Sequence, residues 1–131
     1  MILVDSNVFI DIITTDPEWF DWSYKSIQAG ISTPLVINPV IYAEISLSFN
    51  NAPELDQQLK QLLIEKLPLP YNAAFRAGQA FLHYRRRGGN KRSPLPDFYI
   101  GAHAETEGFT LLTRDAARYK TYFPKLRLIA P

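Results

Sequence analysis

Short apolar runs alternate with helix-forming segments along the whole of this 131-residue chain. Runs of this kind are typical of strands that are buried on both faces of a sheet. Their alternation with helices favours right-handed crossovers and a parallel sheet covered by helices on both sides. The sequence predicts strands at residues 1–4, 34–37, 109–112 and 126–129, and a proline-containing edge strand at 67–70.

Caps and prolines mark where the helices begin. Asp16-Pro17-Glu18 places an N-cap acid before a proline in the first helical position, and Gly30 is a natural stop for that helix. Asn38-Pro39 opens another helix by the same logic. The fold class is therefore α/β, one domain over residues 1–131 with about seven helices, expected at residues 8–13, 16–30, 38–47, 53–63, 73–84, 97–107 and 114–122.

Composition excludes several classes of protein. The apolar fraction of 47% is sufficient for a core, and the net charge of +1 indicates no particular partner. The chain has no cysteine, which excludes disulfides and thiolate metal sites. No apolar run approaches the roughly 20 residues of a membrane span, and the N-terminus lacks the basic start of a signal peptide. We expect a soluble cytoplasmic protein with no membrane partner.

Four acidic residues stand near the predicted strand ends: Asp5, Glu44, Asp97 and Asp115. In a parallel sheet these positions meet at the carboxyl edge, where open α/β sheets place their sites. Crowded carboxylates repel one another unless a cation lies among them, and their oxygens suit Mg²⁺ or Mn²⁺. Such an ion acidifies a bound water and stabilises charge on a phosphodiester, so the pattern predicts metal-dependent hydrolysis of a nucleic acid.

Each acid except one also has a purely structural explanation. Asp5 could cap the following helix, and Asp97 and Asp115 stand in first turns, where the helix dipole favours acids. Glu44 lies in an apolar helical segment, so a functional role is favoured for it alone. Asp11 is predicted to face solvent.

The two histidines are not obvious catalysts. We expect His83 and His103 to be ordinary, partly exposed residues.

At these residues the chain resembles the PIN-domain ribonucleases, most closely the VapC-type toxins of toxin–antitoxin pairs. The resemblance covers nearly the whole chain, as a single PIN domain over residues 1–131. Four segments carry it, each contributing one of the four acids in the family's order: residues 1–11, 39–45, 95–104 and 111–115.

The resemblance implies an α/β/α sandwich with a five-stranded parallel sheet in the order 3-2-1-4-5. It also implies a magnesium-dependent endoribonuclease that forms a homodimer and is neutralised by an antitoxin protein. By the same resemblance, all four acids are catalytic residues, the first three are metal ligands, and Asp115 is a ligand directly or through water. Asn7 and Thr113 would hold ligands or waters in place.

The chain departs from the family after the fourth acid. Many relatives carry a further acid there, where this chain has Ala116-Ala117-Arg118, which puts a second metal site in doubt and suggests that Arg118 faces phosphate. The basic residues of the 85–92 segment suit a path for RNA, although a solvated helix end is an equal alternative. These residues are Arg85, Arg86, Arg87, Lys91 and Arg92.

Two other functions compete with the nuclease. One is a non-catalytic PIN-like module that binds RNA or protein. The other is a receiver-like phosphoryl-transfer domain, which would need an acid where Asn7 stands. An antitoxin could contact the aromatic residues Trp19, Phe20 and Trp22, for which core burial is the alternative explanation.

Overall fold

The sheet is parallel, and its strand order is β3-β2-β1-β4-β5. The computed structural model of the chain describes residues 1–30, 32–88 and 95–131. The strands are β1 (Ile2–Val4), β2 (Leu35–Ile37), β3 (Ile64–Lys66), β4 (Thr110–Leu112) and β5 (Arg127–Ile129). The predicted fold class and strand order are confirmed.

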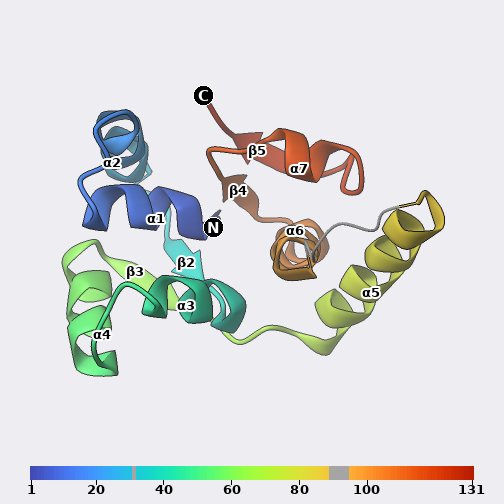
Figure 1. Ribbon diagram of the computed structural model, residues 1–131, viewed down its shortest axis with the longest axis horizontal. Coiled ribbons are helices and arrows are strands. Elements are labelled where there is room, and N and C mark those ends of the chain that lie inside the picture. Colours follow the sequence, from blue (N-terminus) through green and yellow to red (C-terminus); the bar gives the residue numbers. More distant parts are fainter. Residues whose placement is uncertain (31, 89–94) are drawn as a thin grey trace.

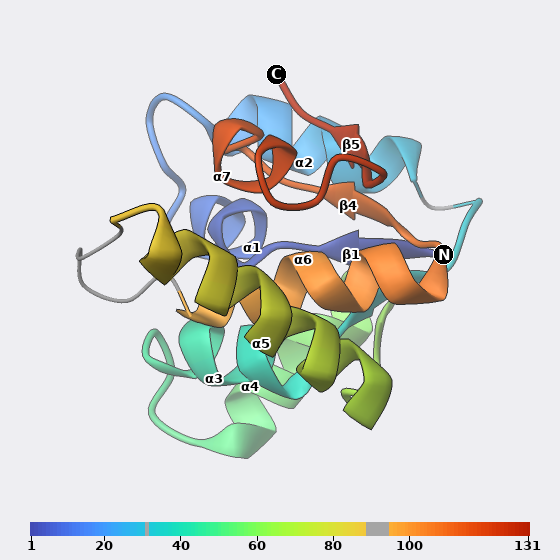
Figure 2. The same cartoon turned by 90° about the vertical axis from the view of Figure 1, so that its right-hand side faces the viewer.

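Helices cover both faces of this sheet. Figure 1 shows α1 and α2 on one side of the central strands and α5 and α6 on the other, and in Figure 2 α5 lies across the outside of α6. Among the described residues there are seven helices: α1 (Ser6–Ile13), α2 (Phe20–Ala29), α3 (Pro39–Ser46), α4 (Ala52–Gln61), α5 (Tyr71–Arg86), α6 (Leu95–Glu107) and α7 (Ala117–Lys120). None of the helices in these ranges is long and apolar enough to cross a membrane.

The central strand β1 is buried on both faces, and apolar side chains pack around it to form the core. Its residues Leu3 and Val4 are fully buried, as are Val36 and Ile37 on β2. This burial explains why the apolar runs show no polar alternation. The edge strand β3 differs, with Ile64 buried and the next two residues exposed.

The third strand lies earlier than the sequence predicted. It spans Ile64–Lys66 rather than residues 67–70. The last hydrogen bond to β2 runs from the Leu67 amide to the Ile37 carbonyl at 2.9 Å. Pairing ends there because β2 itself ends at Ile37, and Asn38 and Pro39 begin α3.

The start of α2 also differs from the prediction. Asp16 accepts hydrogen bonds from the amides of Glu18 and Trp19, both at 2.8 Å, as a capping acid should. The residues it caps form a separate turn, and the helix itself begins at Phe20.

Asp11 is buried, and the prediction that it faces solvent was wrong. Its side chain accepts a hydrogen bond from Ser23 at 2.8 Å, because α2 packs on this face of α1. It also receives two hydrogen bonds from Arg114, from Nε at 2.8 Å and Nη2 at 2.9 Å. The Arg114 guanidinium lies 5.3 Å from the centre of the Trp19 ring. This network ties α1 and α2 to the segment after β4.

The aromatic residues near the start of α2 do not form a free surface. Trp19, Phe20 and Trp22 are all half-buried, and Trp22 packs against the core. Core packing therefore accounts for Trp22.

His103 is buried as well, against the expectation of a partly exposed residue. It is 1% exposed, and its Nδ1 lies 3.0 Å from Nδ2 of Asn38. Asn38 uses its side-chain oxygen to cap α3 through the Ile41 amide at 2.9 Å. The Asn38 amide group must therefore donate to His103, so the imidazole is neutral. Burial lowers the pKa of His103 accordingly. His83, by contrast, is exposed as expected.

A glycine lets α7 approach α6. A Cβ atom on Gly101 would lie 2.6 Å from the ring of Phe123 and 3.1 Å from that of Tyr119. Both aromatic residues are fully or almost fully buried against this position. The close contact fixes where α7 lies relative to α6.

We expect Arg114→Met to lower the free energy of unfolding by about 3 kcal/mol, because it leaves the Asp11 carboxylate buried without its cation. Urea denaturation measures the change. Adding Asp11→Leu to this variant should restore part of the loss, since no buried charge then remains. A loss below about 0.5 kcal/mol for the single variant, typical of a surface site, would contradict the structural role.

Stability should depend on the protonation of His103. The folded-state pKa lies below the ordinary 6.5, so the unfolded chain takes up the proton first as pH falls. The contribution of His103 to the free energy of unfolding is therefore complete above pH 6.5 and is lost as pH falls below that value. Relative to His103→Gln, which keeps an acceptor without a titrating group, wild type should lose up to about 1.4 kcal/mol per pH unit in that window. Parallel pH profiles of the two proteins in urea denaturation would contradict this assignment.

Candidate metal centre

The four predicted acids meet at the carboxyl edge of the sheet. Asp5 follows β1 and Asp115 follows β4, on neighbouring strands. Glu44 lies on α3, which contacts both α1 and α6. Asp97 lies in the first turn of α6. Side chains between them connect all four acids into one network.

Asp5 is the most heavily bonded of the four. It is 3% exposed, and its Oδ1 accepts from the Ser6 amide at 2.7 Å as the N-cap of α1. Its Oδ2 accepts from the hydroxyls of Thr113 and Tyr119, both at 2.8 Å. The capping explanation for Asp5 is therefore confirmed, and the same carboxylate is hydrogen-bonded to side chains that also contact the other acids or their backbone.

Tyr119 was not predicted from the sequence as a member of this centre. Its side chain is fully buried, and a buried tyrosine hydroxyl requires a hydrogen-bonding partner. Burial and the charge of Asp5 raise the pKa of Tyr119 well above its usual value, so it stays protonated and donates. Its position four residues after Asp115 was the available signal, but nothing in the sequence showed which face of α7 would be buried.

Ser6 is the second unpredicted member. Its hydroxyl donates to Glu44 at 2.9 Å and lies 3.4 Å from Asp5. Burial raises the pKa of Glu44, the hydrogen bond from Ser6 opposes that rise, and the charge of Asp5 adds to it. Ser6 therefore orients two of the acids at once.

Thr113 and Asn7 lie beside the acids. Thr113 donates to Asp5 and accepts from the Asp115 amide at 3.0 Å. The Asn7 side chain lies 3.4 Å from the Thr113 hydroxyl and accepts from the Arg114 amide at 3.2 Å. The segment after β4 is thus bonded to the start of α1 at several points.

Asp97 lies where burial and neighbouring charges disfavour its ionised form. Burial raises its pKa to about 6, the charges of Asp5, Glu44 and Asp115 add to the rise, and Arg118 opposes it. A carboxylate in this position is short of positive charge.

Arg118 lies in the centre itself. Its Nη1 is 3.1 Å from Asp97 Oδ2, and its Nε is 2.8 Å from Asp115 Oδ2. One guanidinium therefore bridges two of the four acids. In the structure, the Arg118 guanidinium therefore contacts two carboxylates and does not point toward a free phosphate position.

The donor set suits a hard divalent cation. All four candidate ligands are carboxylates, and hydroxyl groups surround them. Across residues 1–30, 32–88 and 95–131, no three acidic or histidine side chains are placed to hold one ion together. In the arrangement observed, Arg118 supplies the positive charge between Asp97 and Asp115. The residues fit such an ion in their chemistry, and an ion would take over part of the role of Arg118.

The predicted RNA-binding arginines lie at the end of α5. Arg85, Arg86 and Arg87 are all exposed. The guanidinium of Arg85 lies 6.0 Å from the Phe81 ring centre, and that of Arg87 lies 5.8 Å from the Tyr122 ring centre. Lys91 and Arg92 lie outside the described residues.

An apolar hollow lies between α3 and α6. Its volume is about 470 Å³, and α3 and α6 line it with Pro39, Val40, Ala43, Leu95, Pro96 and Tyr99. Glu44 and Asp97 are the next residues along these two helices.

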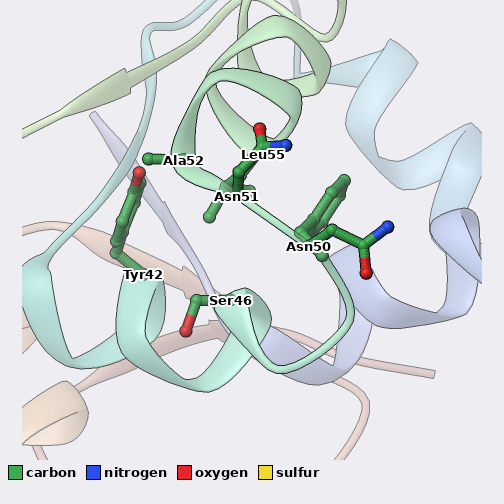
Figure 3. A pocket seen from close by; sticks show the side chains of 7 residues that line it. Tyr42, Ser46, Asn50, Asn51, Ala52 and Leu55 are labelled. Atoms are coloured by element: carbon green, nitrogen blue, oxygen red, sulfur yellow. The ribbon is translucent and has the colours of Figure 1, made fainter.

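A smaller hollow of about 220 Å³ lies between α3 and α4 (Figure 3). It is lined by Tyr42, whose hydroxyl donates to Asp56 at 3.0 Å, but by none of the four acids. It is therefore separate from the candidate metal centre.

Comparisons with known proteins place this geometry in a family. The sequence profile of the PIN domain matches residues 2–124. No curated protein sequence matches the chain significantly.

Three solved structures share the fold across almost their whole length. VapBC2 from Rickettsia felis, bound to a promoter DNA fragment, has a TM-score of 0.75 at 20% identity, covering 100% of this chain and 99% of that one. VapBC from Salmonella typhimurium, also bound to DNA, has 0.71 at 22%, covering 98% and 96%. FitAcB from Neisseria gonorrhoeae has 0.70 at 22%, covering 98% and 96%.

Opposite effects on stability should separate Asp97 from Asp5. The folded-state pKa of Asp97 is raised from 3.8 to about 6. Its favourable contribution to the free energy of unfolding is therefore complete below pH 3.8, where it is protonated in both states, and is lost as pH rises through 6. Without added metal, Asp97→Asn should raise the free energy of unfolding by about 2 kcal/mol at pH 7.5, and the gain should vanish near pH 4.

Asp5→Asn is the matched comparison. It places an amide group where the carboxylate accepts three hydrogen bonds, so it should lower the free energy of unfolding by about 1–3 kcal/mol. Thermal melts in EDTA measure both variants. Destabilisation by Asp97→Asn at pH 7.5 would refute the excess of negative charge at that position.

Proposed function

Because the chain belongs to the PIN-domain family, we propose that it is an endoribonuclease that hydrolyses RNA phosphodiester bonds with Mg²⁺ or Mn²⁺. We also propose that it is the toxin of a toxin–antitoxin pair. The single observation that carries the nuclease proposal is the bonded network of four carboxylates at the carboxyl edge of the sheet. PIN nucleases generally use divalent metal ions, and this network has the donors for one.

In this proposal Asp5, Glu44, Asp97 and Asp115 are the catalytic metal ligands. A bound ion supplies Lewis acidity that lowers the pKa of a water ligand and stabilises charge on the phosphate. Ser6 holds the Glu44 carboxylate, and Tyr119 and Thr113 hold that of Asp5, so both are oriented before any ion binds. The Thr113 hydroxyl also accepts a hydrogen bond from the Asp115 amide, which fixes the backbone at Asp115.

The RNA path would run past the basic end of α5. Arg85, Arg86 and Arg87 are exposed there and can neutralise phosphates without reading sequence. Lys91 and Arg92 belong to the same proposal. The apolar hollow between α3 and α6 is lined by Ala43 and Pro96, which precede Glu44 and Asp97 in the sequence, and the side chain of Tyr99 offers a surface for a base there.

Partner proteins are proposed from two observations. One structural neighbour is a toxin–antitoxin complex from Klebsiella pneumoniae, which supports a cognate antitoxin for this chain. On α5, Tyr71, Phe75 and Leu82 are 94%, 70% and 42% exposed, which is unusual for large apolar side chains on one helix. Such residues suit a protein contact, and we propose that the chain also forms a homodimer.

Purified wild-type protein should cut total cellular RNA into discrete fragments with Mg²⁺ or Mn²⁺ and not with EDTA. Asp97→Asn should lower the cleavage rate by at least about 100-fold, since it removes one ligand carboxylate. This variant should be at least as stable as wild type at neutral pH, so lost activity cannot be attributed to unfolding. Gel analysis of fragments over time provides the rate.

Glu107→Gln is the control for this experiment. It removes an exposed acid from the other end of the same helix and should retain full activity. Cleavage that persists in EDTA or in Asp97→Asn would identify a contaminant. If antitoxin-free wild type binds RNA without cutting it, the chain is a non-catalytic PIN-like binding module instead.

A further inference from the structure

We propose that Arg118 is an exchangeable internal cation, which occupies the acidic centre until a divalent ion displaces it and which thereby weakens metal binding. The inference rests on the proposed metal site. It is carried by the geometry of one guanidinium between two candidate ligands, with Nη1 3.1 Å from Asp97 and Nε 2.8 Å from Asp115. Those two oxygens cannot keep these contacts and also be fully available to an ion.

The side chain of Arg118 is exposed enough to move from the acidic centre into solvent. It is 57% exposed, whereas those of Asp97 and Asp115 are 19% and 40% exposed. Ion pairs that are open to solvent are weak, because water and salt compensate for their loss. A long arginine side chain on the surface can therefore rotate into solvent at little cost.

The backbone of α7 need not move when Arg118 leaves. The next residue, Tyr119, is fully buried and bonded to Asp5 at 2.8 Å. Its ring also packs beside Gly101 of α6. The exchange is thus confined to one side chain on a fixed helix.

Arg114 shows what a permanent structural arginine looks like in the same chain. Both of its contacts go to one carboxylate, Asp11, whose side chain is only 2% exposed. Its guanidinium is also stacked on Trp19. Arg118 instead joins carboxylates from two different elements, the first turn of α6 and the segment before α7. That is the position in which a bridging cation is expected.

Metal titration by calorimetry tests the exchange. With Mn²⁺ as the probe, Arg118→Gln should bind about threefold to tenfold more tightly than wild type, because no ion pair has to be broken first. Lys120→Gln removes the same charge from an exposed position on the same helix. It should change the affinity by less than about twofold, which separates local competition from net charge.

A second readout follows the arginine directly. The Nε–H resonance of Arg118 is identified by its absence from the spectrum of Arg118→Gln. On addition of Mg²⁺ to wild type, it should shift and exchange faster with water, while the Arg114 resonance stays unchanged.

The outcomes separate the exchange from the proposed function. Equal or weaker Mn²⁺ binding by Arg118→Gln, or an Arg118 resonance that Mg²⁺ leaves unchanged, would overturn the exchange and leave the metal site intact. Absence of metal binding in all three proteins would overturn the metal site itself, and with it the exchange.

Discussion

The hydrogen bonds of the Asp5 carboxylate hold the functional end of this molecule together. The residue ends the central strand, and its two oxygens bind the start of α1, the segment after β4, and α7. A charge in so buried a position is tolerated because three donors surround it. The positions of Glu44 and Asp115 follow from the same bonds, through Ser6 and Thr113.

The other acids lack comparable compensation. Asp97 has burial and three neighbouring negative charges against one arginine, and its pKa is raised to about 6 as a result. The centre therefore contains one carboxylate, Asp5, that protein donors satisfy, and another, Asp97, whose surroundings favour an added cation. Stability and proposed chemistry make opposite demands on Asp97, as is common where a site stores unfavourable charge.

Much of the fold could be predicted from the sequence, because strand burial and helix caps are local properties. The strand order came from the family resemblance, and the acids were placed at one edge by the rule for parallel sheets. Asp11 and His103 were misjudged because their partners, Arg114 and Asn38, are distant in sequence. Ser6 was missed for the same reason, since its bond to Glu44 spans 38 positions. Contacts between elements depend on the exact rotation of each helix, which periodicity does not determine.

Asp5 both stabilises the fold through its hydrogen bonds and is a proposed metal ligand, so its presence alone cannot distinguish active from inactive relatives. A descendant that lost the proposed RNA cleavage would be under no pressure to keep Asp97, whose buried charge disfavours the metal-free fold. It would still need an acceptor at the end of β1 to satisfy the buried hydroxyl of Tyr119. In a homologue, an aspartate equivalent to Asp5 would then indicate only that the fold is kept. An acid equivalent to Asp97, at the start of α6, would be the better marker of retained catalytic activity.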